Sequence, residues 1–451
     1  MRAFCLVLIG WFGSTLMATA SAPDPTRLNV GVARTVITPT EPTWLSGYGA
    51  RTMPAQGKVH DLYAKALAFD DGQQRFVLIT LDLGSISPEL TDAVAKGCET
   101  RYKLPRGALV LNCSHTHCAP EIAAERRVFH ALPQEAEVVL VRYIEKLKLQ
   151  LIDLVGLAIK DLAPAQVEYS VGQADFASNR RLPTPNGFIN SPNKDGVTDH
   201  SVPTLRITDP QGKLRAIAIG YACHNTTLSF QQYCGDYAGF AQYALEEAYP
   251  GAIALFIMGC GGDQNPYPRH GPMALDYARL HGQALATAAK KAMAGEQTSI
   301  RGTLKIGFAT PTLSLQPLPA REKLIAQRDG TTGLAQRKAA YLLGQLDTLG
   351  KIELTQPCPL HAIRFGSDML FIAVSGETVL DYAIRCKKEF AGPKVWVAGY
   401  CDDVFAYLPS QRVRREGGYE GVDGIIHQLT PTPFTEKVED EVFAGLKQAM
   451  K

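Results

Sequence analysis

Residues 108–120 constrain the fold more than any other stretch of this sequence. They begin with the apolar run ALVL and turn polar at NCSHTHC, before Pro120. A short continuous apolar run is typical of a strand that is buried on both faces. We therefore expect a buried strand whose carboxyl end presents polar side chains.

His115 and His117 stand two positions apart at this strand end. In an extended chain, residues i and i+2 point to the same face. Two imidazoles on one face can bind one metal ion or one substrate. The alternative is a pair of polar residues at a strand end without a chemical role.

Three other apolar runs end in the same way. Residues 214–220, 252–258 and 369–374 are followed by His224, Asp263 and Glu377, respectively. In α/β folds, ligands bind in the crevice beyond the carboxyl ends of the strands. We therefore expect one pocket that contains these side chains together with His115 and His117. Two histidines and a carboxylate with an open coordination position are typical of a catalytic zinc site.

The rest of the chain alternates between predicted strands and predicted helices. Helical spacing and capping residues predict helices at 87–102, 135–162, 236–248, 273–294, 320–349 (broken near Gly330), 378–390 and 435–450. Further strands are expected at 29–37, in a hairpin over 61–83, at 199–208 and at 395–400. We expect an α/β fold with a mixed β-sheet core flanked by helices, in a single large catalytic domain over residues 23–451.

Two features of this arrangement are unusual: a long segment without a clear strand or helix pattern, and an acidic residue within a predicted strand. Residues 175–198 are rich in Asn, Pro and Gly, and are expected to form a long loop of the kind that is often functional. Asp82 falls within the strand predicted at 75–83, where an unpaired carboxylate would be costly. It is either a partner for a histidine of the site or an acid that faces water at a strand end.

The N-terminus has the features of a signal peptide. Arg2 precedes an apolar segment at 4–17, and the small residues at 18–22 fit a cleavage site. The segment is short for a bilayer span, which needs about 20 residues. We expect a signal peptide at 1–22, export to the periplasm or the medium, and no transmembrane segment after cleavage.

The charge argues against one class of partner, and the cysteine spacing argues against one class of metal site. The net charge is +2 and there is no basic stripe, which argues against nucleic acid as a partner. Of ten cysteines, Cys5 lies in the expected signal peptide, and the remaining nine have irregular spacing that matches no zinc ribbon. We interpret most of them as small core residues.

Taken in order, the motifs of the chain resemble those of the neutral/alkaline ceramidase family. They are VGVAR at 30–34 with ITP at 37–39, GYGAR at 47–51, SHTH at 114–117, CHNT at 223–226, GE at 376–377, and FAY at 405–407 with YEG at 419–421. The resemblance covers most of the chain after residue 22. It implies the catalytic N-terminal domain of the family without the immunoglobulin-like C-terminal domain.

The resemblance also implies a set of site residues. One zinc ion per chain would be held by His115, His224, Glu377 and Tyr407. His117 would stand beside the metal, where it could transfer protons or hold the substrate oxygen. Arg180 follows Asn179 in a segment that matches a family Asn-Arg pair near the active site; the alternative is a solvated surface pair.

One motif departs from the family pattern. Where the family has Gly-Asp-x-Ser-Pro-Asn, this chain has GDQNPY at 262–267, so that Asn265 replaces the serine. The substitution removes a hydroxyl nucleophile and with it an acyl-enzyme on serine. An amide can still donate to a developing oxyanion, so a mechanism based on zinc and water is retained.

These observations predict an exported zinc amidohydrolase that acts on a small N-acyl amide or a lipid of that kind. Zinc-activated water would attack the amide, with His117 or Asn265 assisting the oxyanion and His117 or Asp263 protonating the leaving amine. Two alternatives stay open: a non-catalytic exported binding protein on the same fold, and an esterase or peptidase at the same site. A phosphatase is disfavoured, because it usually needs two metal ions.

Overall fold

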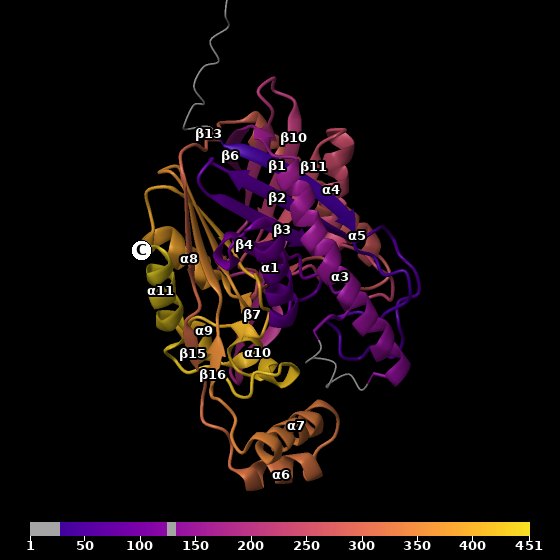
Figure 1. Ribbon diagram of the computed structural model, residues 1–451. Coiled ribbons are helices and arrows are strands. Elements are labelled where there is room, and N and C mark those ends of the chain that lie inside the picture. Colours follow the sequence, from indigo (N-terminus) through magenta and orange to yellow (C-terminus); the bar gives the residue numbers. More distant parts are fainter. Residues whose placement is uncertain (1–27, 124–131) are drawn as a thin grey trace, which may run out of the picture.

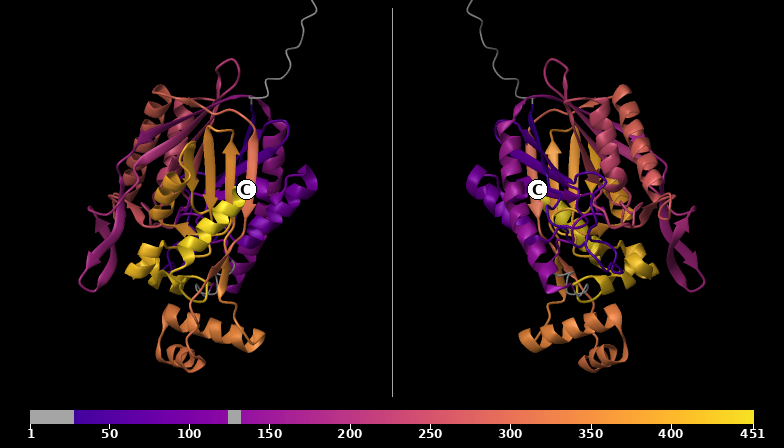
Figure 2. Two further views of the ribbon diagram at one scale, coloured as in Figure 1. Left: turned by 90° about the vertical axis from the view of Figure 1, so that its left-hand side faces the viewer. Right: turned by 90° about the vertical axis from the view of Figure 1, so that its right-hand side faces the viewer.

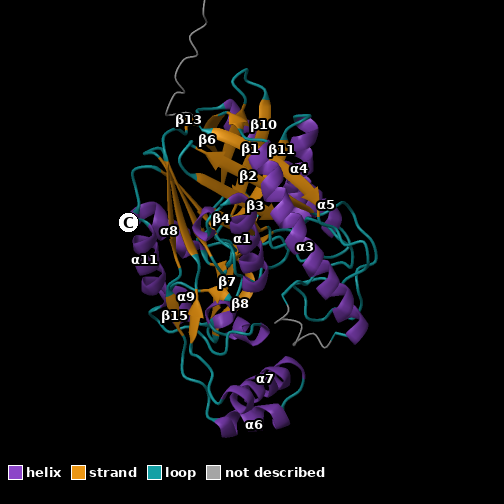
Figure 3. Cartoon of the chain, in the orientation of Figure 1, coloured by secondary structure: helices purple, strands orange, loops and turns teal. Residues whose placement is uncertain are grey.

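The computed structural model describes residues 28–123 and 132–451 (Figure 1). The expected signal peptide at 1–22 lies outside the described residues. β-Sheets occupy the middle of the molecule and helices lie around them (Figure 3). This is the mixed α/β architecture that the sequence predicts.

The first sheet contains the strand that precedes His115. In the order β4-β3-β2-β1-β5, its strands are β1 (Asn29–Val36), β2 (Tyr63–Asp70), β3 (Arg75–Leu81), β4 (Leu109–Cys113) and β5 (Ala163–Pro164). β1 to β3 form an antiparallel meander, and β4 runs parallel to β3 after α1 (Pro88–Tyr102) and the short helix η1 (Arg106–Ala108). All five residues of β4 are buried, as the apolar run predicts.

Two helices accompany this sheet. α1 begins where the Ser87 side chain accepts a hydrogen bond from the Leu90 backbone, with Pro88 in the first turn. α3 (Gln134–Lys160) packs against β1 and β2 through apolar residues at helical spacing, including Leu147 and Leu151. Both helices are confirmed close to their predicted bounds.

The second sheet leads to His224. In the order β11-β10-β9-β6-β13, its strands are β6 (Gln166–Gln173), β9 (Ser201–Thr208), β10 (Leu214–Tyr221), β11 (Ile253–Met258) and β13 (Thr298–Ser299). β10 and β11 are parallel, so their carboxyl ends lie at the same edge. α4 (Asp236–Ala248) and α5 (Ala274–Ala294) pack against this sheet and against each other.

The third sheet leads to Glu377. In the order β14-β17-β18-β20, its strands are β14 (Leu304–Ala309), β17 (Leu360–Phe365), β18 (Met369–Val374) and β20 (Lys394–Ala398). β18 is fully buried and runs parallel to β20. α8 (Leu380–Glu389) and α11 (Val438–Ala449) contribute to the apolar cluster on this sheet.

The three sheets share one apolar core. Its buried residues come from every sheet, for example Leu67 from the first, Leu205 from the second and Phe371 from the third. Because protein interiors are close-packed, this cluster fixes the three sheets relative to one another. The strand ends that carry His115, His224 and Glu377 are thereby fixed as well.

The expectation of a long loop at 175–198 is wrong. The segment forms a hairpin of β7 (Ala177–Thr184) and β8 (Gly187–Asn193), with β12 (Gln264–Pro266) paired to β7. Figure 2 shows this hairpin projecting from the body of the protein. The exposed strand β8 lacks the alternation of apolar and polar residues by which a strand is recognised in a sequence. The hairpin is instead defined by backbone pairing next to its turn, where Gly187 has a φ of +108°.

The helix predicted at 320–349 is two helices, α6 (Arg321–Gly330) and α7 (Gly333–Leu349), with the break where Gly330 predicts it. They form a helical hairpin that hangs below the body (Figures 1 and 2). The hairpin is inserted between β15 (Thr312–Ser314) and β16 (Thr355–Pro357), which pair with each other.

Short elements complete the region around the strand ends. They are β19 (Glu377–Thr378), β21 (Tyr407–Leu408), α9 (Gln411–Glu416), α10 (Gly418–Gly421) and η2 (Asp423–His427). Within the described part of the chain, none of the helices combines the length and apolarity needed to cross a bilayer.

The cysteines and Asp82 are packed inside the fold. All nine cysteines after residue 22 are buried and none of them forms a disulfide, in agreement with their interpretation as core residues. Neither expectation for Asp82 holds: its buried carboxylate accepts hydrogen bonds from the Tyr63 backbone and from the Gln242 amide, which joins the first sheet to α4. Burial raises the pKa of Asp82, and nearby Lys65 opposes that rise.

Candidate metal centre

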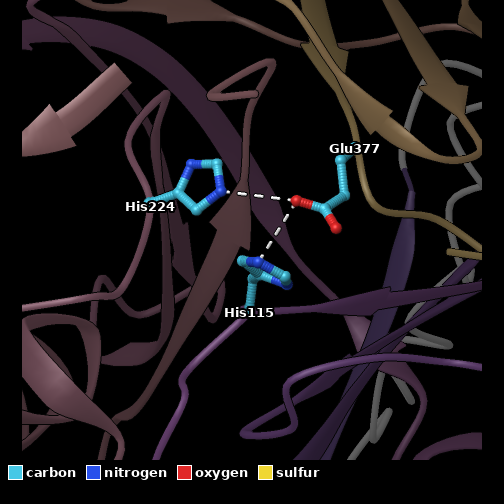
Figure 4. A group of neighbouring side chains, drawn as sticks. All are labelled: His115, His224 and Glu377. Carbon is cyan, nitrogen blue, oxygen red and sulfur yellow. Dashed lines mark ion pairs between the residues drawn. The ribbon is translucent and has the colours of Figure 1, made fainter. Parts of the chain in front are cut away.

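His115, His224 and Glu377 converge although each comes from a different sheet. His115 Nε2 lies 3.4 Å and His224 Nε2 lies 3.3 Å from Glu377 Oε2. One ligand atom from each of the three residues lies within 4.8 Å of the others, and all three side chains are buried. Figure 4 shows both imidazoles directed at the same carboxylate oxygen.

The backbone after β4 holds His115 in a strained conformation. Its φ is +61°, a region that residues other than glycine rarely adopt. The flanking Ser114 is fixed on both sides, since its N–H donates to Leu81 O and its carbonyl accepts from the Asn225 amide. Such strain persists where the surroundings over-determine it, and it is characteristic of functional sites.

The hydrogen bonds of both histidines define their tautomers. His115 Nδ1 lies 2.6 Å from Gly84 O, and His224 Nδ1 lies 2.8 Å from Gly261 O. A carbonyl oxygen only accepts, so each Nδ1 carries the proton and each Nε2 presents a lone pair. Burial lowers the pKa of His224, and the charge of Arg180 lowers it further. Neutral imidazole is the form that ligates a metal.

This donor set fits a divalent cation. Two Nε2 lone pairs face a carboxylate oxygen at close range, an arrangement in which a positive charge is needed between the groups. Two imidazoles and one carboxylate, with both histidines oriented through Nδ1, form a donor set that zinc sites use. The residues present therefore fit the metal that the resemblance implies.

Tyr407 stands beside Glu377 through strand pairing. β19 and β21 are parallel, and Glu377 pairs with Tyr407 in register. The Tyr407 hydroxyl lies 3.4 Å from His224 Nε2 and accepts a hydrogen bond from Arg180 Nη2 at 3.0 Å. Burial raises the pKa of Tyr407 well above its usual value, while the Arg180 guanidinium opposes that rise. The hydroxyl is thus at the edge of the three-residue group.

Arg180 is buried, which excludes the alternative of a solvated surface pair. Its Nε donates to Glu420 Oε1 at 2.7 Å, and Arg181 Nη1 donates to Glu420 Oε2 at 2.8 Å. Burial alone would raise the pKa of Glu420, but the two guanidinium groups hold it below the usual value. One carboxylate therefore orients the arginine that contacts Tyr407.

His117 lies next to His115, with its Nε2 3.2 Å from His115 Nε2. The loop at 45–51 holds His117 in position. Arg51 donates a hydrogen bond to His117 O, and the Tyr48 ring packs edge-on against the imidazole with 4.6 Å between the ring centroids. A Cβ on Gly47 would lie 2.1 Å from His117 Cγ, so the imidazole occupies the space that glycine leaves. Burial and the neighbouring His115 and His224 lower the pKa of His117 well below its usual value.

Asp263 and Asn265 form hydrogen bonds to groups around the site. Asp263 Oδ1 accepts from the Leu380 backbone N–H at the start of α8, and burial raises its pKa to about 6. Asn265 Oδ1 accepts from Arg180 Nη1 at 3.2 Å. A cavity lies beside the metal group, by which we mean His115, His224 and Glu377. Neither Asp263 nor Asn265 is among the described residues that line this cavity.

That cavity has a volume of about 100 Å³, and its lining includes His115, Glu377 and His117. Tyr407, Tyr419 and Leu334 also line it. It lies directly over the group of potential ligands, so a reacting bond placed there would be within reach of His117.

Sequence reasoning missed several residues that build this site. Glu420 was noted only as part of the YEG segment, although it orients both Arg180 and Arg181. Asn225 follows His224 directly and holds the His115 segment. Asn225 stands beside a predicted ligand, which is a signal in the sequence that could have indicated it, whereas no local pattern links Glu420 to Arg180.

Comparisons with known proteins agree with this arrangement. A family model described as neutral/alkaline non-lysosomal ceramidase, N-terminal, matches residues 28–255, which is half of the chain and includes His115, Arg180 and His224. Neutral ceramidase from Pseudomonas aeruginosa superimposes with a TM-score of 0.71 at 18% identity, covering 94% of this chain and 74% of that one.

A second solved structure, a ceramidase complexed with C2, has a TM-score of 0.70 at 16% identity with the same coverage. These structural likenesses establish a shared fold over nearly the whole of the present chain. The family match covers the first sheet, strands β6, β9 and β10 of the second sheet, and the segments that carry His115 and His224. The chain belongs to the neutral/alkaline non-lysosomal ceramidase family.

Proposed function

We propose that this protein is an exported, zinc-dependent amidohydrolase of the ceramidase type, which hydrolyses an N-acyl amide to a carboxylic acid and an amine. The observation that carries the proposal is the convergence of His115 Nε2, His224 Nε2 and Glu377 Oε2, with both Nδ1 protons directed at backbone carbonyls. The family membership supports the reaction class. The signal-like sequence at 1–22 supports export.

His115, His224 and Glu377 would hold the zinc ion, with Tyr407 as a further ligand or a hydrogen-bond donor at its edge. Bound zinc supplies a Lewis acid that polarises the amide carbonyl and lowers the pKa of a bound water to about 7. Three protein ligands leave room for water and substrate, as in catalytic sites.

His117 is the group placed to move protons. It is buried, neutral at pH 7 because of its lowered pKa, and adjacent to His115. Its imidazole accepts a proton from the attacking water and returns it to the nitrogen of the leaving amine, so that both products leave neutral before they ionise in water.

Arg180 and Tyr407 orient the opposite side of the site. The Tyr407 hydroxyl accepts from Arg180, so its own proton remains available to an oxygen in the cavity that it lines. A tyrosine in this position stabilises the oxyanion that develops at the attacked carbonyl. Asn265 and Glu420 are positioning residues, since both act through Arg180.

The proposal is tested with purified, zinc-loaded protein and a panel of N-acyl amides matched with the corresponding esters. Hydrolysis of amides that is lost in His224→Ala and retained in His200→Ala is the expected result. His200 is a suitable control, since it is bonded to Ala177 O and is not among the described residues that line the cavity. Cleavage of esters alone, or unchanged cleavage by His224→Ala, would contradict it.

A further inference from the structure

The α6–α7 hairpin reaches the metal cavity although most of it stands apart from the body. Leu334, in the first turn of α7, lines the same cavity as Glu377. Among the described residues of the lining, it supplies the one aliphatic side chain; the others are glycine, aromatic or polar. The hairpin therefore contributes an apolar surface at the opening of the site.

The hairpin has its own small core. Leu324, Leu342 and Leu343 are buried together in a cluster that is separate from the larger clusters of the sheets. Residues 315–320 and 350–354 connect the two helices to β15 and β16, and Figure 2 shows the pair hanging at one end of the molecule. Displacing the hairpin would leave the main core intact, which is the property of an element that moves as a unit.

One buried lysine holds the hairpin in place. Lys338 of α7 donates from Nζ to Thr430 O at 2.8 Å and to Gln428 O, and its side chain is buried. Gln428 itself lines the metal cavity. The contact therefore couples the position of α7 to the wall of the site.

The cavity is small for the substrates of the proposed function. Its volume is about 100 Å³, whereas pockets that enclose whole drug-sized ligands are about 300–1,000 Å³. A cavity of this size has room for the reacting amide beside His115 and His117 but not for an attached long chain, and Leu334 is the aliphatic residue of its lining.

Building on the proposed function, we infer that the α6–α7 hairpin is a movable cap that selects N-acyl substrates with a long apolar chain, and that Leu334 contacts this chain. Burial lowers the pKa of Lys338 to about 7, so the closed position carries a desolvation cost that opening relieves. Because the hairpin has a small core of its own and the burial of Lys338 is unfavourable, the open and closed positions are close in free energy. An apolar chain buried against Leu334 then favours closure.

Kinetics with a chain-length series tests the inference. Acetyl, octanoyl and hexadecanoyl amides of one amine are compared in wild type, Leu334→Ser and Leu349→Ser. Leu349 is the matched control, since it lies at the far end of α7 with 62% of its surface exposed. We expect Leu334→Ser to raise KM for the hexadecanoyl amide about tenfold with little change for the acetyl amide. Equal effects on all chain lengths, or no effect, would overturn the inference.

A binding measurement keeps the test independent of turnover and of the folding of a variant. Hydrogen exchange of wild-type α7 is followed with acetohydroxamate and with hexadecanoyl hydroxamate, both of which ligate zinc. The expected result is slower exchange in α7 with the long-chain probe alone. If both probes bind and neither changes α7, the cap is refuted while the metal site stands. If neither probe binds, the proposed function fails as well.

Discussion

Asn265 Oδ1 accepts a hydrogen bond from Arg180 Nη1 at 3.2 Å, and Arg180 Nη2 donates to the Tyr407 hydroxyl. The residue at the family's serine position is therefore linked to the metal group through one guanidinium. From this contact we propose that Asn265 orients Arg180; the oxyanion role that the sequence suggested for its amide stays a prediction.

Replacing Asn265 should affect rate more than metal binding. In Asn265→Ala, Arg180 Nη1 loses an acceptor, and a hydrogen bond to a charged group contributes about 1.5–3 kcal/mol. We expect kcat/KM to fall at least about tenfold. Asn265→Ser keeps an acceptor oxygen and should retain more activity than the alanine variant. Metal content should stay the same in both, and an Asn265→Ala enzyme with wild-type kinetics would refute the role.

Gly47 should be required for the position of His117. An added Cβ would lie 2.1 Å from His117 Cγ, and φ at Gly47 is +88°. Gly47→Ala is expected to displace the imidazole and to lower kcat by about 100-fold or more, the usual contribution of a proton-transfer group. Gly49→Ala is the control, because no atom lies within 4 Å of its added Cβ. Similar activity of the two variants would show that the seat at Gly47 is dispensable.

Asp402 should be a main stabiliser of the segment that leads to the site. Its carboxylate accepts from Arg106 at 2.8 Å, His361 at 2.7 Å and the Leu111 backbone at 2.9 Å. Removing one partner of a buried ion pair costs about 3–5 kcal/mol. Asp402→Asn should lower the free energy of urea unfolding by about that amount at pH 7.

The pH dependence of this effect has a defined sign. Burial alone would raise the pKa of Asp402, but Arg106 and His361 hold it at about 2, below the value of about 3.9 in the unfolded chain. The stabilisation is fully present above pH 4 and is lost as pH falls toward 2. The difference in unfolding free energy between wild type and Asp402→Asn should therefore shrink over this window. A constant difference would contradict the assignment.

Lys338 should make the closed hairpin less stable in acid. Its folded pKa of about 7 lies below the unfolded value of about 10.4, so the exposed lysine binds more protons than the buried one between these pH values. The closed position therefore gains stability as pH rises from 7 to 10. Hydrogen exchange in α7, corrected for intrinsic rates, should show stronger protection at pH 9 than at pH 7.

Two lysine variants isolate this effect. Lys338→Met should remove the pH dependence of protection in α7. Lys351→Met should preserve it, since Lys351 follows α7 and its side chain is 79% exposed. If protection of α7 has the same pH dependence in wild type and in Lys338→Met, a group other than Lys338 causes that dependence.

Much of the fold follows from local patterns. The apolar run before Asn112 and the helical spacing of 135–162 depend on burial that is periodic in the sequence, and the structure contains both elements. The β7–β8 hairpin was missed because its pairing is made by backbone groups, the side chains of β8 are largely exposed, and the buried side chains of β7 are mostly polar. Composition alone indicated a loop there.

The site was predictable where residue chemistry coincides with strand ends. His115, His224 and Glu377 each follow a buried strand, and the structure brings them together. Glu420 pairs with Arg180 across 240 positions of sequence, and no local pattern encodes such a contact. Asp263 also follows a buried strand, but its carboxylate caps α8, so a strand-end acid alone does not define a ligand.

The most direct test of this account is the metal content of the purified protein after zinc loading and exhaustive dialysis. About one zinc per chain is expected in the wild type and in His200→Ala, with near-complete loss in His224→Ala and Glu377→Gln. Circular dichroism of each variant verifies that it is folded. A folded wild-type protein that retains no zinc, or a His224→Ala variant that retains as much as wild type, would contradict the metal centre.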